Sequence, residues 1–389
     1  MRVEGRKLAL VGLEPAELTH LVGTLPGAKP FTPAQIYAWL YSKRARSFAA
    51  MSNLTLPMRR ELERMFEIGL PTLENLSCST DGTRKYLFKM TDGELIESVW
   101  IPEPGRNTMC LSTQVGCRMG CRFCATGLMG LKRNLAGGEI VGQALCVLDD
   151  IGYRDRRVNV VFMGMGEGLD NYENVMKAFR LLTDPDGIAI SSRRITLSTV
   201  GLVPGIERLA TERRAPKLAI SLNSPFDHER SDIMPVNRKY TIASLMDAVA
   251  GFMSAQHAGK RIRLNERVTF EYVLLKGVND TPAHARELIR IVRRVPAKLN
   301  LLAFNPTPSL PFERPDEPWI ESFKQILLDA DVPVSFRRSR GRDIGAACGQ
   351  LVTAHRSQPG QKRHDEPPLT PVRVATKPAG VRGIQEPSG

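Results

Sequence analysis

Apolar residues in the amino-terminal part of the chain recur at the spacing of α-helices. In the segment 31–41, Ile36 and Leu40 would share one face of a helix. A second helix is predicted over 57–68. We therefore assign residues 1–84 to a small helical accessory domain and its linker.

The pattern then changes to that of a β-hairpin. The apolar runs 85–90 and 94–101 flank the dipeptide Asp92-Gly93, which favours a tight turn between antiparallel strands. Residues 85–106 are thus predicted to form a β-hairpin extension.

From about residue 107, short apolar runs alternate with segments of helical spacing, which predicts parallel strands joined by helices. Strands are expected near 108–114, 158–163, 194–198, 218–222, 268–275 and 299–304. Helices are expected over 139–150, 172–182, 242–257, 282–293 and 317–330. The six units indicate an α/β fold, a partial (β/α)6 barrel over 107–352, with a doubly wound open sheet as the alternative.

Composition excludes some classes of protein. The chain has 389 residues, 42% of them hydrophobic, and no apolar run long enough for a transmembrane helix. Its first residues lack the apolar centre of a signal peptide, so we expect a cytoplasmic protein without a membrane partner. The segment 353–389 is rich in proline and glycine, which predicts a disordered tail.

The excess of basic residues points to a polyanionic partner. Lysine and arginine total 54 against 41 aspartates and glutamates, a net charge of +13. This surplus favours nucleic acid, although a basic protein with an ordinary solvated surface is the plainer alternative. Arginine pairs such as Arg193-Arg194 suit contacts to RNA phosphates.

The most specific chemical signal is the spacing of Cys117, Cys121 and Cys124, directly after a predicted strand. The chain must curl to aim three thiols at one point, and Gly116 and Gly120 provide the backbone freedom. Sulfur ligands select zinc or an iron–sulfur cluster. No histidine or further cysteine has local zinc-like spacing, so a cluster with one open iron is favoured. Structural zinc and a chance group of buried thiols are the alternatives.

The cysteine motif and its surroundings resemble the RlmN/Cfr family of radical-SAM RNA adenine methyltransferases. The resemblance runs from about residue 87 to 352. It implies a radical-SAM barrel that uses two molecules of S-adenosylmethionine (SAM) per turnover and holds one [4Fe-4S] cluster on Cys117, Cys121 and Cys124. The motifs that carry it, besides the cysteines, are Glu97-Ser-Val-Trp-Ile-Pro, Gly164-Met-Gly-Glu167, Thr196-Leu-Ser-Thr and Gly345-Ala-Ala-Cys348-Gly-Gln.

The SAM site is expected where the predicted strands end, because barrel enzymes build their active sites on that face. Each polar residue at a strand end could equally satisfy a turn. The resemblance assigns the SAM site to Gly166, Glu167, Ser198, Ser221, Leu222, Asn223 and Asn305.

The resemblance also implies a relay through two further cysteines. The Cys348 thiolate takes a methyl group from a first SAM, and a radical made from a second SAM converts it to a methylene radical that adds to an adenine carbon. Cys110 then forms a disulfide with Cys348 and releases the product. Because C2 of adenine is electrophilic, direct methyl-cation transfer fails there, whereas a carbon radical adds. The residues alone would favour a buried, inert thiol at Cys348.

Glu97 is the third predicted catalytic residue. By strand alternation its carboxylate shares a face with Val99 and Ile101, and an apolar setting would raise its pKa towards that of a general base. The alternative is an edge-strand charge that points to water. The resemblance implies that Glu97 accepts the proton of the adenine adduct.

We predict a radical-SAM enzyme that methylates C2 of adenine in RNA. The resemblance implies that its substrates are an adenine in the peptidyl-transferase centre of 23S rRNA and the adenine next to the anticodon in some tRNAs. A monomer is expected, with an electron donor for the cluster and a reductant for the disulfide as partners. Two alternatives stay open: a C8-specific methyltransferase of the Cfr type, and a zinc-stabilised RNA-binding protein without catalysis.

Metal analysis separates the cluster from zinc. Protein purified without oxygen should contain about four irons per chain, because a cubane cluster holds that number. Iron and zinc are measured by elemental mass spectrometry on the same sample. Stoichiometric zinc without iron would contradict the prediction.

Overall fold

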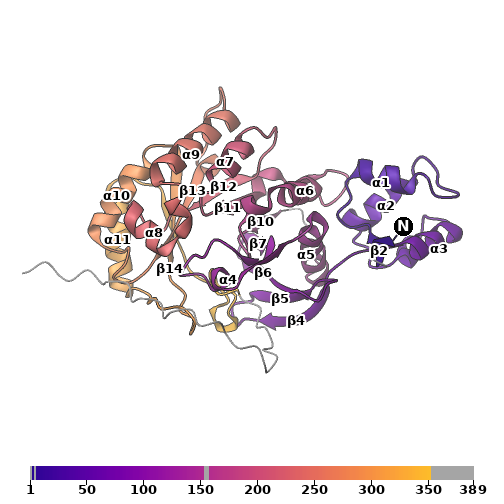
Figure 1. Ribbon diagram of the computed structural model, residues 1–389, viewed down its shortest axis with the longest axis horizontal. Helices are drawn as coiled ribbons and strands as arrows, with labels where there is room; N and C mark the ends of the chain where they lie inside the picture. The colour runs from indigo at the N-terminus through magenta and orange to yellow at the C-terminus, as the bar shows by residue number, and fades with distance from the viewer. Residues whose placement is uncertain (1, 4–5, 153–156, 352–389) are drawn as a thin grey trace, which may run out of the picture.

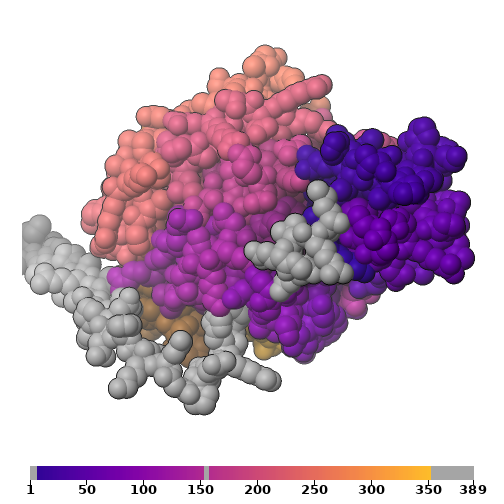
Figure 2. Space-filling view, turned by 45° about the vertical axis from the view of Figure 1, so that its right-hand side comes forward, coloured from indigo at the N-terminus to yellow at the C-terminus, as the bar shows by residue number. Residues whose placement is uncertain are grey.

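The computed structural model describes residues 2–3, 6–152 and 157–351 (Figure 1). The tail predicted over 353–389 lies outside these residues. The body is a mixed sheet of ten strands with helices packed around its parallel part, and the amino-terminal unit projects from one side (Figures 1 and 2). None of the described helices combines the length and apolar character that crossing a bilayer requires.

The parallel strands neighbour one another in chain order, without reversal. A doubly wound sheet reverses its order at a switch point, so that alternative is wrong and the α/β fold of barrel type is confirmed. The strands are β7 (Arg106–Cys110), β10 (Val158–Phe162), β11 (Ile195–Thr199), β12 (Lys217–Ser221), β13 (Val268–Leu274), β14 (Ala297–Ala303) and β15 (Val334–Arg337).

Helices follow the first six of these strands. The sequence pattern does not predict the short helices α7 and α8 or the short strand β15, because a few residues display little periodicity. The helices are α5 (Gly137–Asp150), α6 (Tyr172–Thr183), α7 (Val203–Ala210), α8 (Asp227–Ile233), α9 (Ile242–Gln256), α10 (Pro282–Val292) and α11 (Glu317–Asp329).

Three antiparallel strands extend the sheet beyond β7. The predicted hairpin is present as β5 (Arg84–Lys89) and β6 (Leu95–Glu103), and β6 pairs with β7. A third strand, β4 (Thr72–Cys78), lies within the segment assigned to the linker and pairs with β5. This strand is largely exposed at the sheet edge, so it has no face that must be apolar. Its sequence therefore lacks the alternation of apolar and polar residues that predicts a strand.

The amino-terminal unit combines helices with a small sheet. The helix predicted over 57–68 ends at Met65, because the next two residues pair with β2. Its elements are α1 (Pro15–Val22), α2 (Thr32–Tyr37), a π-helical turn (Ala38–Ser42), α3 (Leu56–Met65), β1 (Arg2–Val3), β2 (Arg6–Ala9) and β3 (Phe66–Glu67).

The unit is attached to α5 and α6. Ion pairs join Arg46 to Asp149 (2.6 Å) and Lys177 to Glu17 (2.8 Å). Gly12, at φ +107°, lies directly against the start of α5, and a Cβ on Gly12 would lie 2.6 Å from the Cα of Gly138. Backbone thus packs directly on backbone at this junction.

The turn between β4 and β5 clamps the carboxyl-terminal segment of the described chain. Asp81 accepts a hydrogen bond from the Gly341 N–H (2.9 Å), and Ser79 donates one to Asp343 (2.6 Å). Burial opposes ionisation of Asp81, but hydrogen bonds from Thr83, Gly341 and Ser79 outweigh it and hold its pKa at about 2.

The clamp predicts a pH-dependent contribution to stability. Because the folded-state pKa of Asp81 lies below its ordinary value of 3.8, its stabilisation is present above about pH 4 and is lost as the pH falls towards 2. Asp81→Asn should therefore lower the free energy of unfolding at neutral pH, and the difference from the unaltered protein should shrink in acid. Urea unfolding at a series of pH values measures it, with Asp186→Asn, an exposed aspartate, as the charge-matched control. A pH-independent difference would contradict the clamp.

Candidate active site

The cysteine motif forms a loop after a short strand. The loop begins at the end of β8 (Gln114–Cys117), leads into α4 (Ala125–Leu128), and is closed by β9 (Gly130–Asn134), which pairs with β8. Gly116 and Gly120 have φ values of +77° and +65°, which confirms that the curl needs glycine.

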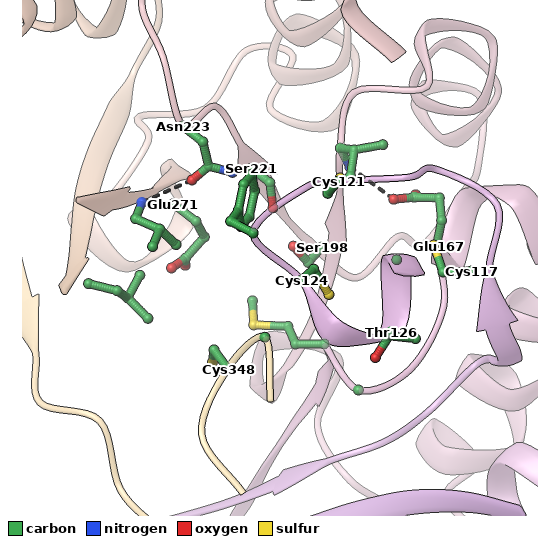
Figure 3. A pocket seen from close by; sticks show the side chains of 18 of the residues that line it. Cys117, Cys121, Cys124, Thr126, Glu167, Ser198, Ser221, Asn223, Glu271 and Cys348 are labelled. Carbon is green, nitrogen blue, oxygen red and sulfur yellow. Dashed lines mark hydrogen bonds between the residues drawn. The ribbon is translucent and has the colours of Figure 1, made fainter. Parts of the chain in front are cut away.

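All three motif thiols line one pocket at the carboxyl ends of the parallel strands (Figure 3). The pocket, with its open mouth, spans about 1060 Å³, at the upper end of the range for small-molecule sites. The predicted site residues that line it are Cys117, Cys121, Cys124, Gly166, Glu167, Ser198, Ser221, Asn223, Asn305 and Cys348.

The three thiols suit a group bound through sulfur. Burial raises the pKa of each, to about 12 for Cys117, and the charges of Cys124 and Cys117 raise that of Cys121 further. A metal cluster would overcome both effects because it binds thiolates. Across the described ranges, no three acidic, histidine or cysteine side chains are arranged to hold a metal ion as they stand.

Glu167 is a buried carboxylate at the pocket wall. It accepts hydrogen bonds from the N–H groups of Val200 (2.9 Å) and Leu169 (3.1 Å). Burial nevertheless raises its pKa to about 7. A cationic ligand group beside it would favour the charged form, so the site suits an ammonium group.

Asn305 offers a free acceptor to the pocket. Its Nδ2 donates to the Cys348 carbonyl (3.2 Å), and its buried Oδ1 has no hydrogen-bond partner in the part of the chain described here. A buried, unsatisfied acceptor is costly unless a ligand donates to it. Asn223, in contrast, uses its Oδ1 to accept from the Val273 N–H (2.9 Å), which fixes the loop after β12.

Leu222 is the one predicted SAM residue that does not line the pocket. Its side chain is fully buried and does not line the pocket. Its backbone N–H donates to the Glu271 carbonyl (3.0 Å), and its carbonyl accepts from Arg230 (3.0 Å). Leu222 therefore holds the strand end in place.

Cys110 and Cys348 both line a second, smaller pocket, which shares Met163, Leu302 and Cys348 with the first. Both are free thiols, and the pocket is also lined by Val99, Ile101 and Arg337. Burial raises the pKa of Cys110 to about 12, and the charge of Cys348 raises it further, whereas Arg337 lowers it. Desolvation also raises the pKa of Cys348, and Arg337 opposes this rise, so its guanidinium favours the thiolate of either cysteine.

Glu97 is buried, with only 4% of its surface exposed. It lies on β6, an interior strand between β5 and β7, so the alternative of a carboxylate pointing to water is wrong. Lys85, on β5, pairs with it at 2.9 Å. Glu97 lines neither pocket, but it shares its strand face with Val99 and Ile101, which line the second.

Sequence reasoning missed two charged residues at the site. Arg230, on α8, is fully buried and donates to the carbonyls of Val200 (2.6 Å) and Ser221 (3.2 Å), which joins the ends of β11 and β12. No local pattern marks it. Glu271 lines the main pocket, and burial raises its pKa. A charge within the apolar strand β13 was a usable signal for it.

Comparison with known proteins agrees with this geometry. A model of the radical SAM superfamily matches residues 111–289, and one of the ribosomal RNA large subunit methyltransferase N-terminal domain matches residues 8–68. The dual-specificity RNA methyltransferase RlmN of Geobacter sulfurreducens is 47% identical over 325 residues, covering 84% of this chain and 87% of that protein. Its namesake in Rhodospirillum rubrum is 46% identical, covering 88% and 79%.

A solved structure shows the same architecture over most of the chain. The crystal structure of a radical SAM methyltransferase from Sphaerobacter thermophilus is similar with a TM-score of 0.83 and 42% identity, covering 88% of this chain and 99% of that one. Sequence, fold and the thiol-lined pocket at the strand ends thus agree, and the chain belongs to the RlmN family of radical SAM RNA methyltransferases.

Proposed function

We propose that the chain methylates C2 of one adenine in the peptidyl-transferase centre of 23S rRNA and of the adenine next to the anticodon in some tRNAs, through a relay on Cys348. The relatives are named dual-specificity RNA methyltransferases, which supports two classes of RNA substrate. The observation that carries the relay is that Cys348 lines both pockets, with the motif cysteines around one and Cys110 in the other.

The main pocket would bind the cofactor and SAM. Cys117, Cys121 and Cys124 would hold the [4Fe-4S] cluster, which when bound supplies the electron that cleaves SAM. The buried Glu167 carboxylate would accept hydrogen bonds from the SAM ammonium group. The remaining contacts to SAM would come from Gly166, Ser198, Ser221, Asn223 and Asn305.

Cys348 would carry the methyl group. Its thiolate attacks the methyl of a first SAM, and the new S–C bond forms as the sulfonium S–C bond breaks. A hydrogen atom of the bound methyl passes to the 5′-deoxyadenosyl radical released from a second SAM, which becomes 5′-deoxyadenosine. The methylene radical left on the Cys348 sulfur adds to C2 of adenine. A one-electron acceptor then takes the unpaired electron, and Glu97 accepts the C2 proton.

Cys110 would release the product. Its thiolate attacks the Cys348 sulfur, the bond from that sulfur to the methylene carbon breaks, and the electron pair goes to the carbon, which takes a proton to become a methyl group. The disulfide left behind needs an external reductant. The shared pocket brings Cys110 and Cys348 together for this exchange.

The relay predicts that Cys348→Ala abolishes methylation while the cluster and SAM binding survive. The alanine has no sulfur to carry the methyl group, whereas the cluster ligands lie on another loop. Mass mapping of nucleosides from rRNA and tRNA measures the product, expected as 2-methyladenosine with the unaltered enzyme. Product at the unaltered rate from the variant would refute the relay, and 8-methyladenosine would indicate a Cfr-type reaction.

Cys110→Ala should instead trap the reaction halfway. Without the attacking thiolate, the bond between Cys348 and the adenine remains, so a covalent protein–RNA adduct accumulates after one turnover. Denaturing gel electrophoresis with labelled RNA detects it, and Cys78→Ala, at an exposed cysteine outside both pockets, is the matched control. Free methylated RNA without adduct would argue against this role for Cys110.

A further inference from the structure

Lys85 lies between the proposed base and the loop that carries Cys348. Its Nζ is 2.9 Å from the Glu97 carboxylate and 3.4 Å from the Gly345 carbonyl oxygen, three residues before Cys348. The pair is largely enclosed, with 18% of the lysine side chain and 5% of the glutamate side chain exposed. One ammonium group therefore contacts both segments.

The sheet register places Lys85 at this position. Lys85 pairs with Val99 across β5 and β6, so Glu97, two residues earlier on β6, is its diagonal neighbour on the same face. A long side chain reaches across this diagonal. The opposite face of the hairpin packs on α5, where Ser98 donates to Gln143 (2.7 Å), so the face with Lys85 is left to the carboxyl-terminal loop.

The loop has anchors besides Lys85. Asp81 accepts a hydrogen bond from Gly341, and Ser79 donates one to Asp343. Gly341 and Asp343 lie in the turn before Gly345. These bonds hold the entry to the loop, whereas Lys85 contacts it closer to the thiol. Removing the Lys85 ammonium would thus leave the loop attached and loosen its position relative to Glu97.

We propose that Lys85 is a positioning residue that sets the distance between Glu97 and Cys348, an inference that rests on the proposed function. In the relay both groups act on one adenine carbon. The methylene carbon carried by Cys348 forms a bond to C2, and Glu97 accepts the proton of C2. A cation bound to both the carboxylate and the loop would hold the Glu97 side chain aimed at that carbon. Lysine suits this position because its ammonium has three donors for partners on different segments.

The inference predicts that Lys85→Met stalls the reaction after the methyl group has moved from SAM to Cys348. In Lys85→Met, Cys348 should still gain its methyl group from SAM, because that step needs only the thiolate and the main pocket. Product release should slow by about 100-fold, the effect of a small misplacement of a reacting group, and the protein–RNA adduct should accumulate although Cys110 is intact. Lys85→Arg, which keeps a cation at this position, should restore most of the rate.

The test uses full-length enzyme with its cluster, SAM, a reductant and a 23S rRNA transcript. Peptide mass spectrometry reports S-methylation of Cys348, gel electrophoresis reports adduct, and nucleoside analysis reports product. Lys89→Met is the matched control, because this lysine lies on the same face of β5 and is exposed.

The outcomes separate positioning from a merely structural role. Adduct accumulation with normal S-methylation in Lys85→Met supports the inference. Turnover at the unaltered rate overturns it, and so does a parallel loss of S-methylation and product without adduct, which would mean that the loop has lost its structure. Unaltered enzyme that forms no S-methylcysteine would instead refute the proposed function on which the inference rests.

Discussion

Parallel pairing of the strands in chain order is the constraint on which the site depends. When each strand neighbours the next, every carboxyl end lies on one rim, and residues far apart in sequence come together there. Ser198, Ser221 and Asn305 meet at the pocket for this reason. The guanidinium of Arg230 holds two of these strand ends through their carbonyl groups. Burial lowers the pKa of the Arg230 guanidinium to about 10, which still leaves it positively charged at neutral pH. Arg230 therefore places a buried positive charge close to the cysteine loop.

Local patterns predicted much of this site. The periodicity of apolar residues predicted the helices and most strands of the barrel. The parallel topology then predicted that the polar residues after each strand lie at one site. The cysteine loop was recognisable because its chemistry needs a fixed spacing and glycines that adopt positive φ. β4 and α8 were missed, because an exposed edge strand and a helix of seven residues display little pattern.

Contacts between residues far apart in the sequence could not be predicted from local patterns. The carbonyl of Gly345 lies 260 residues from Lys85 along the chain, and nothing in either local sequence indicates that the two meet. The alternation of β6 correctly placed Glu97 with Val99 and Ile101, but it did not supply the lysine opposite. That partner matters because the 2.9 Å ion pair fixes the position of the Glu97 carboxylate, which an apolar wall would not do.

The junction at Gly12 constrains the orientation of the amino-terminal unit and the residues that its sequence can accept there. The exposed ion pairs around it contribute little and weaken further as salt rises. The direct backbone approach to Gly138 is short-ranged and indifferent to ionic strength. The backbone contact between Gly12 and Gly138 therefore limits the angles that the amino-terminal unit can adopt relative to α5. A Cβ on Gly12 would lie 2.6 Å from the Cα of Gly138, and a Cβ on Gly138 would lie 2.4 Å from the carbonyl oxygen of Val11, so a side chain at either position would force the two backbones apart.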